Sequence, residues 1–175
     1  MNKKVVLLAG LPGVGKSTLA RMIAKRECGL VLDIDEIKRK IVDPRLVTST
    51  IDPPEVRWRC YEKAAEEVLS LLEKGASTII VDEVFHLANL RQKLEELFLE
   101  KGIEVFWLEV LCSYVEVERR LREKSRSGHI LSTDEALKMN LLFEGIFERF
   151  PEGKKNHIIF RNENGCDFEN LMFNP

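Results

Sequence analysis

The residues whose types and spacing could do chemistry lie near the start of the chain. Residues 10–18 read Gly-Leu-Pro-Gly-Val-Gly-Lys-Ser-Thr, which is the spacing of a loop that wraps a phosphate chain. Glycine allows the backbone angles that turn N–H groups inward, and a helix starting at Lys16 would point its positive end at the anion. Lys16 would reach the β- and γ-phosphates, and Ser17 would offer its hydroxyl to Mg²⁺. The predicted nucleotide-binding residues are Gly10, Pro12, Gly13, Val14, Gly15, Lys16, Ser17 and Thr18.

The segments on either side of this loop have the order that the motif requires. Residues 4–9 form a nearly continuous apolar run, which is typical of a strand buried on both faces. After the loop, Leu19, Ala20 and Ile23 recur at helical spacing, and Gly29 marks the end of that helix. A strand, a loop and a helix in this order favour nucleoside triphosphate binding over a chance match.

The rest of the chain alternates between strand and helix patterns. Further strands are expected at 30–34, 77–81, 103–108 and 157–160, and the strand at 30–34 reads as buried. Helices are expected at 35–42, 54–73, 88–101, from 113, from 132 and at 168–173. Ser113 with Glu116 and Ser132 with Glu135 have the spacing of capping boxes. This alternation predicts an α/β fold with a parallel sheet.

Composition narrows the class of protein. The 175 residues fit a single domain, 1–175, without a linker. Lys and Arg total 27 against 29 Asp and Glu, so the net charge of −2 gives no general attraction to nucleic acid. The four cysteines are widely spaced, which favours free thiols in a reducing cytoplasm over a metal cluster. No apolar stretch approaches the roughly 18 residues of a membrane span, so no membrane partner is expected.

Carboxylates stand where two of the expected strands end. Asp33 and Asp35 follow one strand, and Asp82 and Glu83 follow another, at the edge where open α/β sheets bind ligands. Asp33 could hold a magnesium-bound water or simply end the strand, and Asp35 could cap the next helix. Asp82 is expected to contact Mg²⁺ through water or to hold a substrate. Glu83 has either a structural or substrate-side role or, as in P-loop ATPases, the role of activating water.

Four stretches together resemble the small P-loop kinases and phosphotransferases grouped around polynucleotide 5'-kinase, zeta toxin and chloramphenicol phosphotransferase. They are the phosphate loop, residues 32–38, residues 79–82 with Arg91, and the four-residue spacing of Arg122 and Arg126. The resemblance covers about residues 4–160. It implies a three-layer P-loop NTPase fold, with a five-stranded parallel sheet, helices on both faces and a small helical lid at about 122–133.

The resemblance also implies roles in phosphoryl transfer, in which catalysis is mostly positioning and electrostatic stabilisation. The counterpart of Asp35 is the base that accepts the proton of the acceptor hydroxyl. Arg122 and Arg126 would close over the phosphates with Lys16 and Mg²⁺, although Arg120 with Lys124 also fits the family spacing if no insertion is allowed.

On the substrate side the expected residues are Asp35, Lys38, Asp82 and Arg91. Lys38 stands where polynucleotide kinases have an arginine, and it lacks the planar fork that grips a phosphate, so a 3'-phosphorylated nucleic-acid end is a less secure substrate. Arg91 could equally pair with Glu95. Arg161 and Asn162 stand where the relatives seat adenine.

These patterns predict an ATP-dependent kinase that transfers the γ-phosphate to a hydroxyl of a small molecule or of a nucleic-acid 5' end, with Mg²⁺. The alternative is a P-loop ATPase or nucleotide-dependent interaction module that uses Asp82 and Glu83. A GTPase is disfavoured, because neither guanine-reading nor switch motifs follow the loop. The sequence indicates no oligomeric state.

Overall fold

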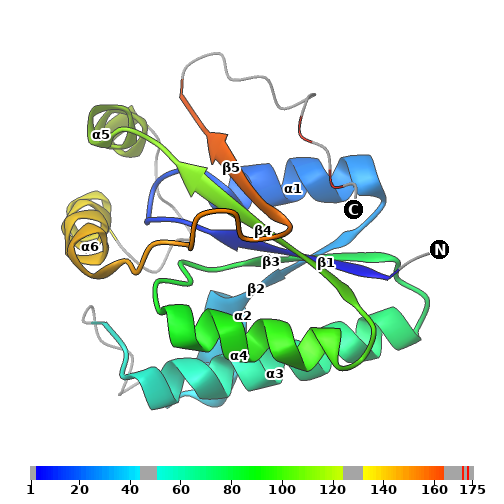
Figure 1. The fold of residues 1–175 in the computed structure, drawn as a ribbon. Helices are drawn as coiled ribbons and strands as arrows, with labels where there is room; N and C mark the ends of the chain where they lie inside the picture. The colour runs from blue at the N-terminus through cyan, green and yellow to red at the C-terminus, as the bar shows by residue number, and fades with distance from the viewer. Residues whose placement is uncertain (1–2, 44–50, 124–131, 164–170, 172, 174–175) are drawn as a thin grey trace.

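The computed structural model describes residues 3–43, 51–123, 132–163, 171 and 173, and its strands and helices alternate along the chain (Figure 1). The elements are β1 (Lys4–Ala9), α1 (Lys16–Glu27), β2 (Leu30–Asp33), α2 (Ile34–Ile41), α3 (Pro54–Glu73), β3 (Thr78–Asp82), α4 (Ala88–Leu99), β4 (Glu104–Leu111), α5 (Tyr114–Glu123), α6 (Thr133–Ile146) and β5 (His157–Arg161). The helix expected at 168–173 lies largely outside the described residues.

The strands form one parallel sheet of five, in the order β2-β3-β1-β4-β5. This confirms the predicted α/β fold with a five-stranded parallel sheet. The apolar sequence at 30–34 predicted a buried strand. In the structure β2 is only partly buried, because it is an edge strand. Leu30 and Val31 are 46% and 39% exposed, and Leu32 alone of its apolar residues is buried.

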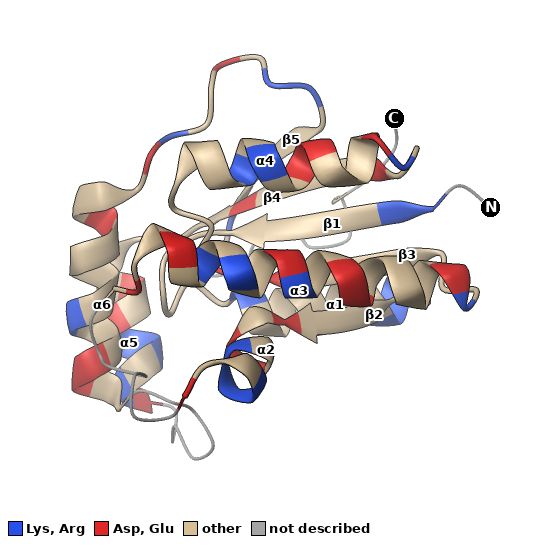
Figure 2. Ribbon diagram, turned by 90° about the horizontal axis from the view of Figure 1, so that it is seen from below, with Lys and Arg blue, Asp and Glu red and all other residues tan. Residues whose placement is uncertain are grey.

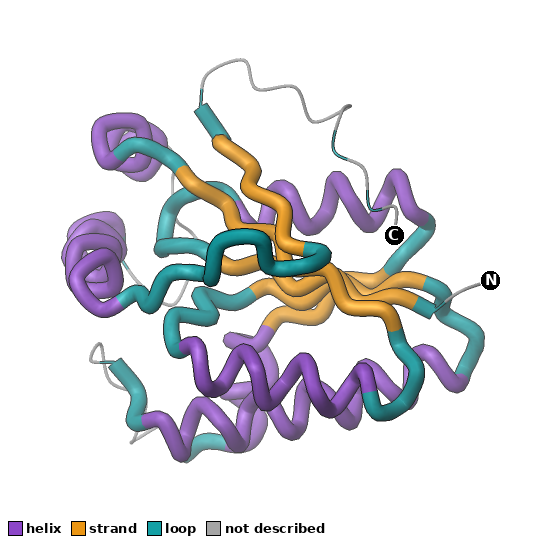
Figure 3. The backbone as a smooth tube through the Cα atoms, in the orientation of Figure 1, coloured by secondary structure: helices purple, strands orange, loops and turns teal. Residues whose placement is uncertain are grey.

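Helices cover both faces of the sheet, as the tube in Figure 3 shows. Alternate residues of the central strand β1 point to opposite faces, so Val5 and Leu7 pack with α2, α3 and α4 while Val6 and Leu8 pack with α1, α5 and α6. Two apolar cores result, one on each face. A three-layer arrangement of this kind fixes the strand ends relative to the helices that begin beside them.

The carboxyl ends of the strands meet at one edge, and α5 and α6 lie beyond this edge (Figure 1). Asp33 of β2 is in register with Asp82 of β3, which in turn is in register with Leu8 of β1. The predicted capping box at the start of α6 is confirmed, with Ser132 and Glu135 exchanging hydrogen bonds. The lid predicted at about 122–133 falls mainly on residues 124–131, outside the described residues.

Acidic and basic residues are interspersed along α3 and α4 (Figure 2). Such a mixture is typical of helices whose outer face is in water. Within the described residues, none of the helices combines the length and the apolar character needed to cross a bilayer.

Candidate active site

The phosphate loop between β1 and α1 has a backbone that only glycine can form. Gly10, Gly13 and Gly15 all have positive φ, at 146°, 86° and 96°. A Cβ on Gly13 would lie 2.8 Å from a methyl of Val117, and one on Gly15 would collide with the side-chain amide of Asn162. The spacing of the glycines in the sequence therefore reflects close packing around the loop as well as its backbone angles.

Lys16 lies against the loop that it follows. Its ammonium donates to the carbonyl oxygens of Gly10 and Leu11, at 2.9 and 3.1 Å, and the residue is 9% exposed. Ser17 and Thr18 are exposed in the first turn of α1. A phosphate in the loop would meet the Lys16 ammonium, the free N–H groups at the start of α1 and the Ser17 hydroxyl together.

Two asparagines from distant parts of the chain hold the loop in place, and both donate to its carbonyl groups. The side-chain amide of Asn140 on α6 donates to the carbonyl oxygen of Pro12 at 2.6 Å, and it is 2% exposed. Asn162 after β5 donates to the carbonyl oxygen of Val14 at 2.7 Å. The sequence predicted an adenine-side position for Asn162 and no role for Asn140. The one signal for Asn140 was a polar residue on the apolar face of an amphipathic helix.

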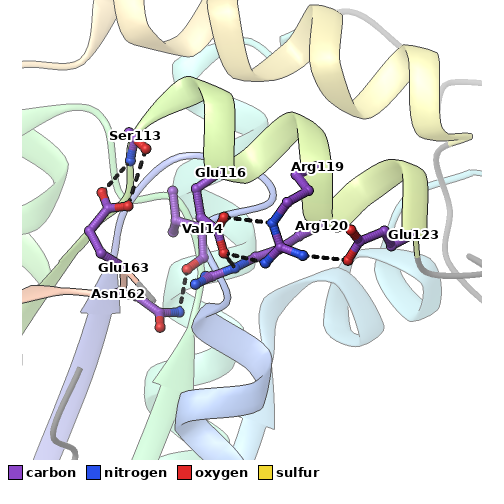
Figure 4. Close-up of polar contacts among 8 residues, drawn as sticks. All are labelled: Val14, Ser113, Glu116, Arg119, Arg120, Glu123, Asn162 and Glu163. Atoms are coloured by element: carbon purple, nitrogen blue, oxygen red, sulfur yellow. Dashed lines mark hydrogen bonds and ion pairs between the residues drawn. The ribbon is translucent and has the colours of Figure 1, made fainter. Parts of the chain in front are cut away.

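An arginine of α5, Arg120, lies beside the loop (Figure 4). A guanidinium nitrogen of Arg120 lies 3.8 Å from the position that a Cβ of Gly15 would take. The Nε of Arg120 pairs with Glu116 at 2.5 Å, and Arg119 pairs with the same carboxylate at 2.7 Å. Hydrogen bonds from Arg119, followed by those from Arg120, lower the pKa of Glu116 to about 2. Glu116 is thus ionised and holds Arg120 beside the loop.

The capping box predicted for Ser113 and Glu116 is not formed, because both residues have other partners. The backbone N–H and hydroxyl of Ser113 donate to Glu163, at 2.6 and 3.1 Å, while Glu116 faces the arginines (Figure 4). Glu163 follows Asn162, so the segment after β5 contacts both the loop and the start of α5. This connection joins residues about 50 apart in sequence.

The family spacing suggested that Arg122 reaches the loop, but in the structure it does not. Arg122 is 58% exposed and pairs with Glu118 at 2.9 Å. Because residues two apart on a helix point roughly 200° from one another, Arg122 faces away when Arg120 faces the loop. Arg126 lies outside the described residues.

Three carboxylates lie at the ends of β2 and β3. Asp33, rather than Asp35, caps α2: its Oδ1 accepts from the Asp35 backbone N–H at 2.8 Å. Burial raises the pKa of Asp33 to about 6, and the neighbouring charges of Asp35 and Asp82 add to this. Asp82 is buried, at 7% exposure. Asp35 is exposed in the first turn of α2, and within the described residues its carboxylate has no ion-pair partner.

Glu83 interacts electrostatically with one of these carboxylates and donates a hydrogen bond to the strand that leads into the phosphate loop. It pairs with Arg57 of α3 at 3.0 Å, and its backbone N–H donates to the carbonyl oxygen of Leu8 just before the loop. Burial raises the pKa of Glu83 against the opposing effect of Arg57. The carboxylate of Asp35 raises this pKa further and the ammonium of Lys16 lowers it, so both groups lie within electrostatic reach of Glu83.

The two remaining residues expected on the substrate side have partners elsewhere. Lys38 on α2 pairs with Asp52 at 2.5 Å. Arg91 is 3% exposed and donates to the carbonyl oxygens of Phe85 and Glu148, both at 2.6 Å. It does not pair with Glu95, which accepts hydrogen bonds from a lysine and a tryptophan. The contacts of Arg91 are those of a residue that joins α4 to the segment after α6.

Within the part of the chain that the structure describes, there is no group of three or more His, Cys, Asp or Glu side chains that could hold a metal ion. Magnesium in phosphoryl-transfer sites is held largely by phosphate oxygens and water, with few protein ligands. The two ligands that the sequence predicted are Ser17, which lies in the first turn of α1, and Asp82, which lies at the end of β3.

A family model described as an AAA domain matches residues 5–144, and no curated protein sequence matches the chain. Among solved structures, a gluconokinase from Sinorhizobium meliloti 1021 is 16% identical with a TM-score of 0.67, over 95% of this chain and 85% of that one. A sugar kinase from Janibacter sp. HTCC2649 is 20% identical with a TM-score of 0.69, over 91% and 86%. The APS kinase of Mycobacterium tuberculosis, solved with AMPPNP and APS, is 19% identical with a TM-score of 0.63, over 96% and 92%.

At these identities the likeness to solved structures shows the fold. The resemblance to small P-loop kinases that the motifs predicted is confirmed, since all three of these structures are kinases of this fold.

Proposed function

We propose that this chain, which belongs to the AAA domain family, is an ATP-dependent kinase that transfers the γ-phosphate of Mg-ATP to a hydroxyl group. One observation carries the proposal: Lys16, in the loop and helix that follow β1, and the exposed Asp35, which follows β2, stand at the same carboxyl edge of one parallel sheet. Lys16 and Asp35 both shift the pKa of Glu83. A kinase needs this arrangement, with cations around the phosphates and a base across from them.

On the nucleotide side, the loop amides and Lys16 bind the β- and γ-phosphates, and Ser17 with Asp82 positions the magnesium ion. Bound Mg²⁺ would neutralise charge on the phosphates. Arg120, held by Glu116, supplies a further positive charge next to the loop. Arg126 remains a candidate for a second one. Charge that develops on the γ-phosphoryl oxygens is thus met by cations that are already in place. Because the reaction consumes ATP, we place the protein in the cytoplasm.

On the other side, the acceptor hydroxyl lies against Asp35 and attacks the γ-phosphorus. The new bond joins the acceptor oxygen to phosphorus, the bond to the β,γ-bridging oxygen breaks, and ADP leaves. The hydroxyl proton passes to the Asp35 carboxylate. Asp35 suits this role because it is exposed, and Asp33 performs the capping that would otherwise occupy it.

The rival ATPase reading assigns water activation to Glu83. That side chain is in an ion pair with Arg57 and is only 10% exposed. A carboxylate held in this way is poorly placed to orient an attacking water. The structure therefore favours a structural role for Glu83 and supports the kinase.

The test compares Asp35→Asn with Glu36→Gln, a change of the neighbouring exposed carboxylate in the same turn of α2. Acceptors to screen are sugars, sugar acids and an oligonucleotide with a free 5'-hydroxyl, because the fold neighbours include a gluconokinase and a sugar kinase. Asp35→Asn should lower acceptor-dependent ADP release about 10³-fold. Its affinity for Mg-ATP in calorimetry should match the wild type, and Glu36→Gln should keep full activity. If Glu83→Gln instead stops all ATP turnover and Asp35→Asn has no effect, the protein is an ATPase.

A further inference from the structure

Seven charged residues at the ends of β2 and β3, on α2 and beside the start of α3 form a group that we call the acceptor edge. Its members are Asp33, Asp35, Lys38, Asp52, Arg57, Asp82 and Glu83. Two of the seven are cations and five are carboxylates. How these charges pair determines which acceptor can approach Asp35.

Both cations of the acceptor edge are already neutralised by carboxylates of the protein. Lys38 pairs with Asp52 at 2.5 Å, and each of the two side chains is 14% exposed. Arg57 pairs with Glu83 at 3.0 Å, with 8% and 10% exposed. Ion pairs with so little contact with water are weakly screened, so neither cation is available to an incoming anion without the loss of a protein partner.

The other three carboxylates of the acceptor edge have no cationic partner among the described residues. Asp33 and Asp82 stand in register on neighbouring strands, and Asp35 follows two residues after Asp33. Their proximity is visible in the charge of Asp35 and Asp82 acting on Asp33. After the two pairs cancel, Asp33 and Asp35 leave negative charge on the acceptor edge near the phosphate loop, and Asp82 is the carboxylate that would share Mg²⁺ with the phosphates.

Arg57 retains one unsatisfied polar atom. Its side chain is 8% exposed, its Nε has no hydrogen-bond partner among the residues that the structure describes, and its guanidinium lies 5.3 Å from the ring centre of Phe143. A buried N–H of this kind calls for an oxygen acceptor, while the positive charge of the same group is already balanced by Glu83. A neutral hydroxyl oxygen would satisfy the donor without adding charge.

We propose that the acceptor of this kinase is an uncharged or cationic hydroxyl compound, such as a polyol or an amino sugar, and not a carboxylate or a phosphate ester. This inference rests on the proposed function. The pairing of Lys38 with Asp52 and of Arg57 with Glu83 leaves an edge that repels anions and accepts neutral or positive groups. Glu83 is then a specificity-determining residue, because it cancels the buried cation of the acceptor edge.

The first arm of the test compares a neutral and an anionic compound of the same open-chain skeleton, and adds a cyclic amino sugar as a cation. D-Glucitol and D-gluconate differ only in a terminal CH₂OH or carboxylate, and D-glucosamine supplies a cation. Acceptor-dependent ADP release should favour glucitol or glucosamine over gluconate by at least tenfold in kcat/KM. A tenfold preference for gluconate overturns the inference about charge and leaves the kinase proposal intact. Loss of ADP release in Asp35→Asn with the preferred member shows that the kinase proposal holds.

The second arm measures binding and needs no turnover. With Mg-ADP bound, calorimetry follows the addition of gluconate to the wild type, to Glu83→Gln and to Glu66→Gln, which removes an exposed carboxylate of α3. The wild type and Glu66→Gln should show no binding at millimolar gluconate, and Glu83→Gln should gain it. Asp52→Asn, which frees Lys38, should shift in the same direction and guards against misfolding of Glu83→Gln. Tight binding of gluconate to the wild type, or no gain in either variant, overturns the inference.

Discussion

In the proposed kinase reaction the phosphate loop binds ATP and the acceptor edge binds the hydroxyl compound, and the two regions are built in opposite ways. The loop is made of backbone, and its glycines and Lys16 lie within six positions of one another, from Gly10 to Lys16, although Asn140 and Asn162 also support it from distant parts of the chain. The acceptor edge is made of side chains, and its pairs join residues 14 and 26 positions apart, Lys38 with Asp52 and Arg57 with Glu83. The sequence motif of the loop is therefore local, whereas the ion pairs of the acceptor edge depend on the fold.

The difference between the loop and the acceptor edge indicates where substitutions can change function. A Cβ at any of the three loop glycines would meet backbone or packed side chains, so the nucleotide side tolerates little variation. Exchange of one partner in an acceptor-edge pair changes the local charge without changing the backbone. The same nucleotide-binding loop can thus serve different acceptors, in keeping with the rule that function depends on the site and not on the fold.

The largest effect is expected on the loop side, from Lys16→Ala. Removal of the ammonium takes away a charge that meets the γ-phosphate, so kcat should fall about 10³-fold. Lys25→Ala, on the exposed side of α1, should change kcat less than twofold. ADP release at saturating ATP measures both. A fall of less than tenfold for Lys16→Ala would show that the loop does not position the transferred phosphate.

The next effect separates two arginines of α5. Arg120→Ala should lower kcat about 10²-fold, because its guanidinium lies beside Gly15. Arg122→Ala should change it less than twofold, since Arg122 is exposed and pairs only on the surface with Glu118. The same assay compares the two variants at matched protein concentration. Equal losses, or a larger loss for Arg122→Ala, would mean that α5 turns when ATP binds.

A smaller effect is expected from the contact that supports the loop from α6. Asn140→Ala leaves the Pro12 carbonyl oxygen without its 2.6 Å donor, and should lower the free energy of unfolding by about 1–3 kcal/mol. The KM for ATP should rise while kcat changes little, because the loop loses support and Lys16 remains. Urea denaturation and steady-state kinetics measure the two quantities. Lys138→Ala, exposed on the same helix, is the control and should alter neither.

The sequence predicted the loop side well and the acceptor edge only in part. Glycine spacing, apolar runs and the order of the elements placed the loop and the ends of the strands, because these depend on neighbours in the chain. Asp33 and Asp82 were placed at one edge because parallel strands end together. Arg57, in contrast, has no local feature that distinguishes it from other charged residues of α3, and its pairing with Glu83 is visible only in the fold.

Glu116 shows why a local rule can mislead. Its spacing from Ser113 fits a capping box, and its spacing from Arg120 fits an ion pair one helical turn away. Both readings are equally good in the sequence. The structure selects the second, because Glu163 arrives from the segment after β5 and takes the hydrogen bonds of Ser113.

The smallest expected effect is on the pH dependence of the free energy of unfolding. It tests how unfavourable the negative charge of Asp33 is within the acceptor edge. The pKa of Asp33 is raised to about 6, whereas an unfolded aspartate titrates near 3.9. Between these values the folded protein binds a proton more readily than the unfolded chain does, so this residue makes stability fall as pH rises from about 4 to about 6. Asp33→Asn keeps an oxygen that can cap α2 and removes the charge.

Asp33→Asn should therefore be more stable than the wild type at pH 7.5, by about 1 kcal/mol after allowance for solvent screening, and the two should converge near pH 4. Urea denaturation at pH 4, 5, 6 and 7.5 measures the difference, with Asp134→Asn on α6 as an exposed control. If the stability advantage of Asp33→Asn instead grew toward low pH, the pKa of Asp33 would be lowered and not raised in the folded protein. A cation would then compensate the Asp33 carboxylate. A constant difference would trace to the cap alone. Convergence at low pH shows that the folded protein disfavours the charged form of Asp33, first through burial and then through the charges of Asp35 and Asp82, and the latter are the charges that would repel an anionic acceptor.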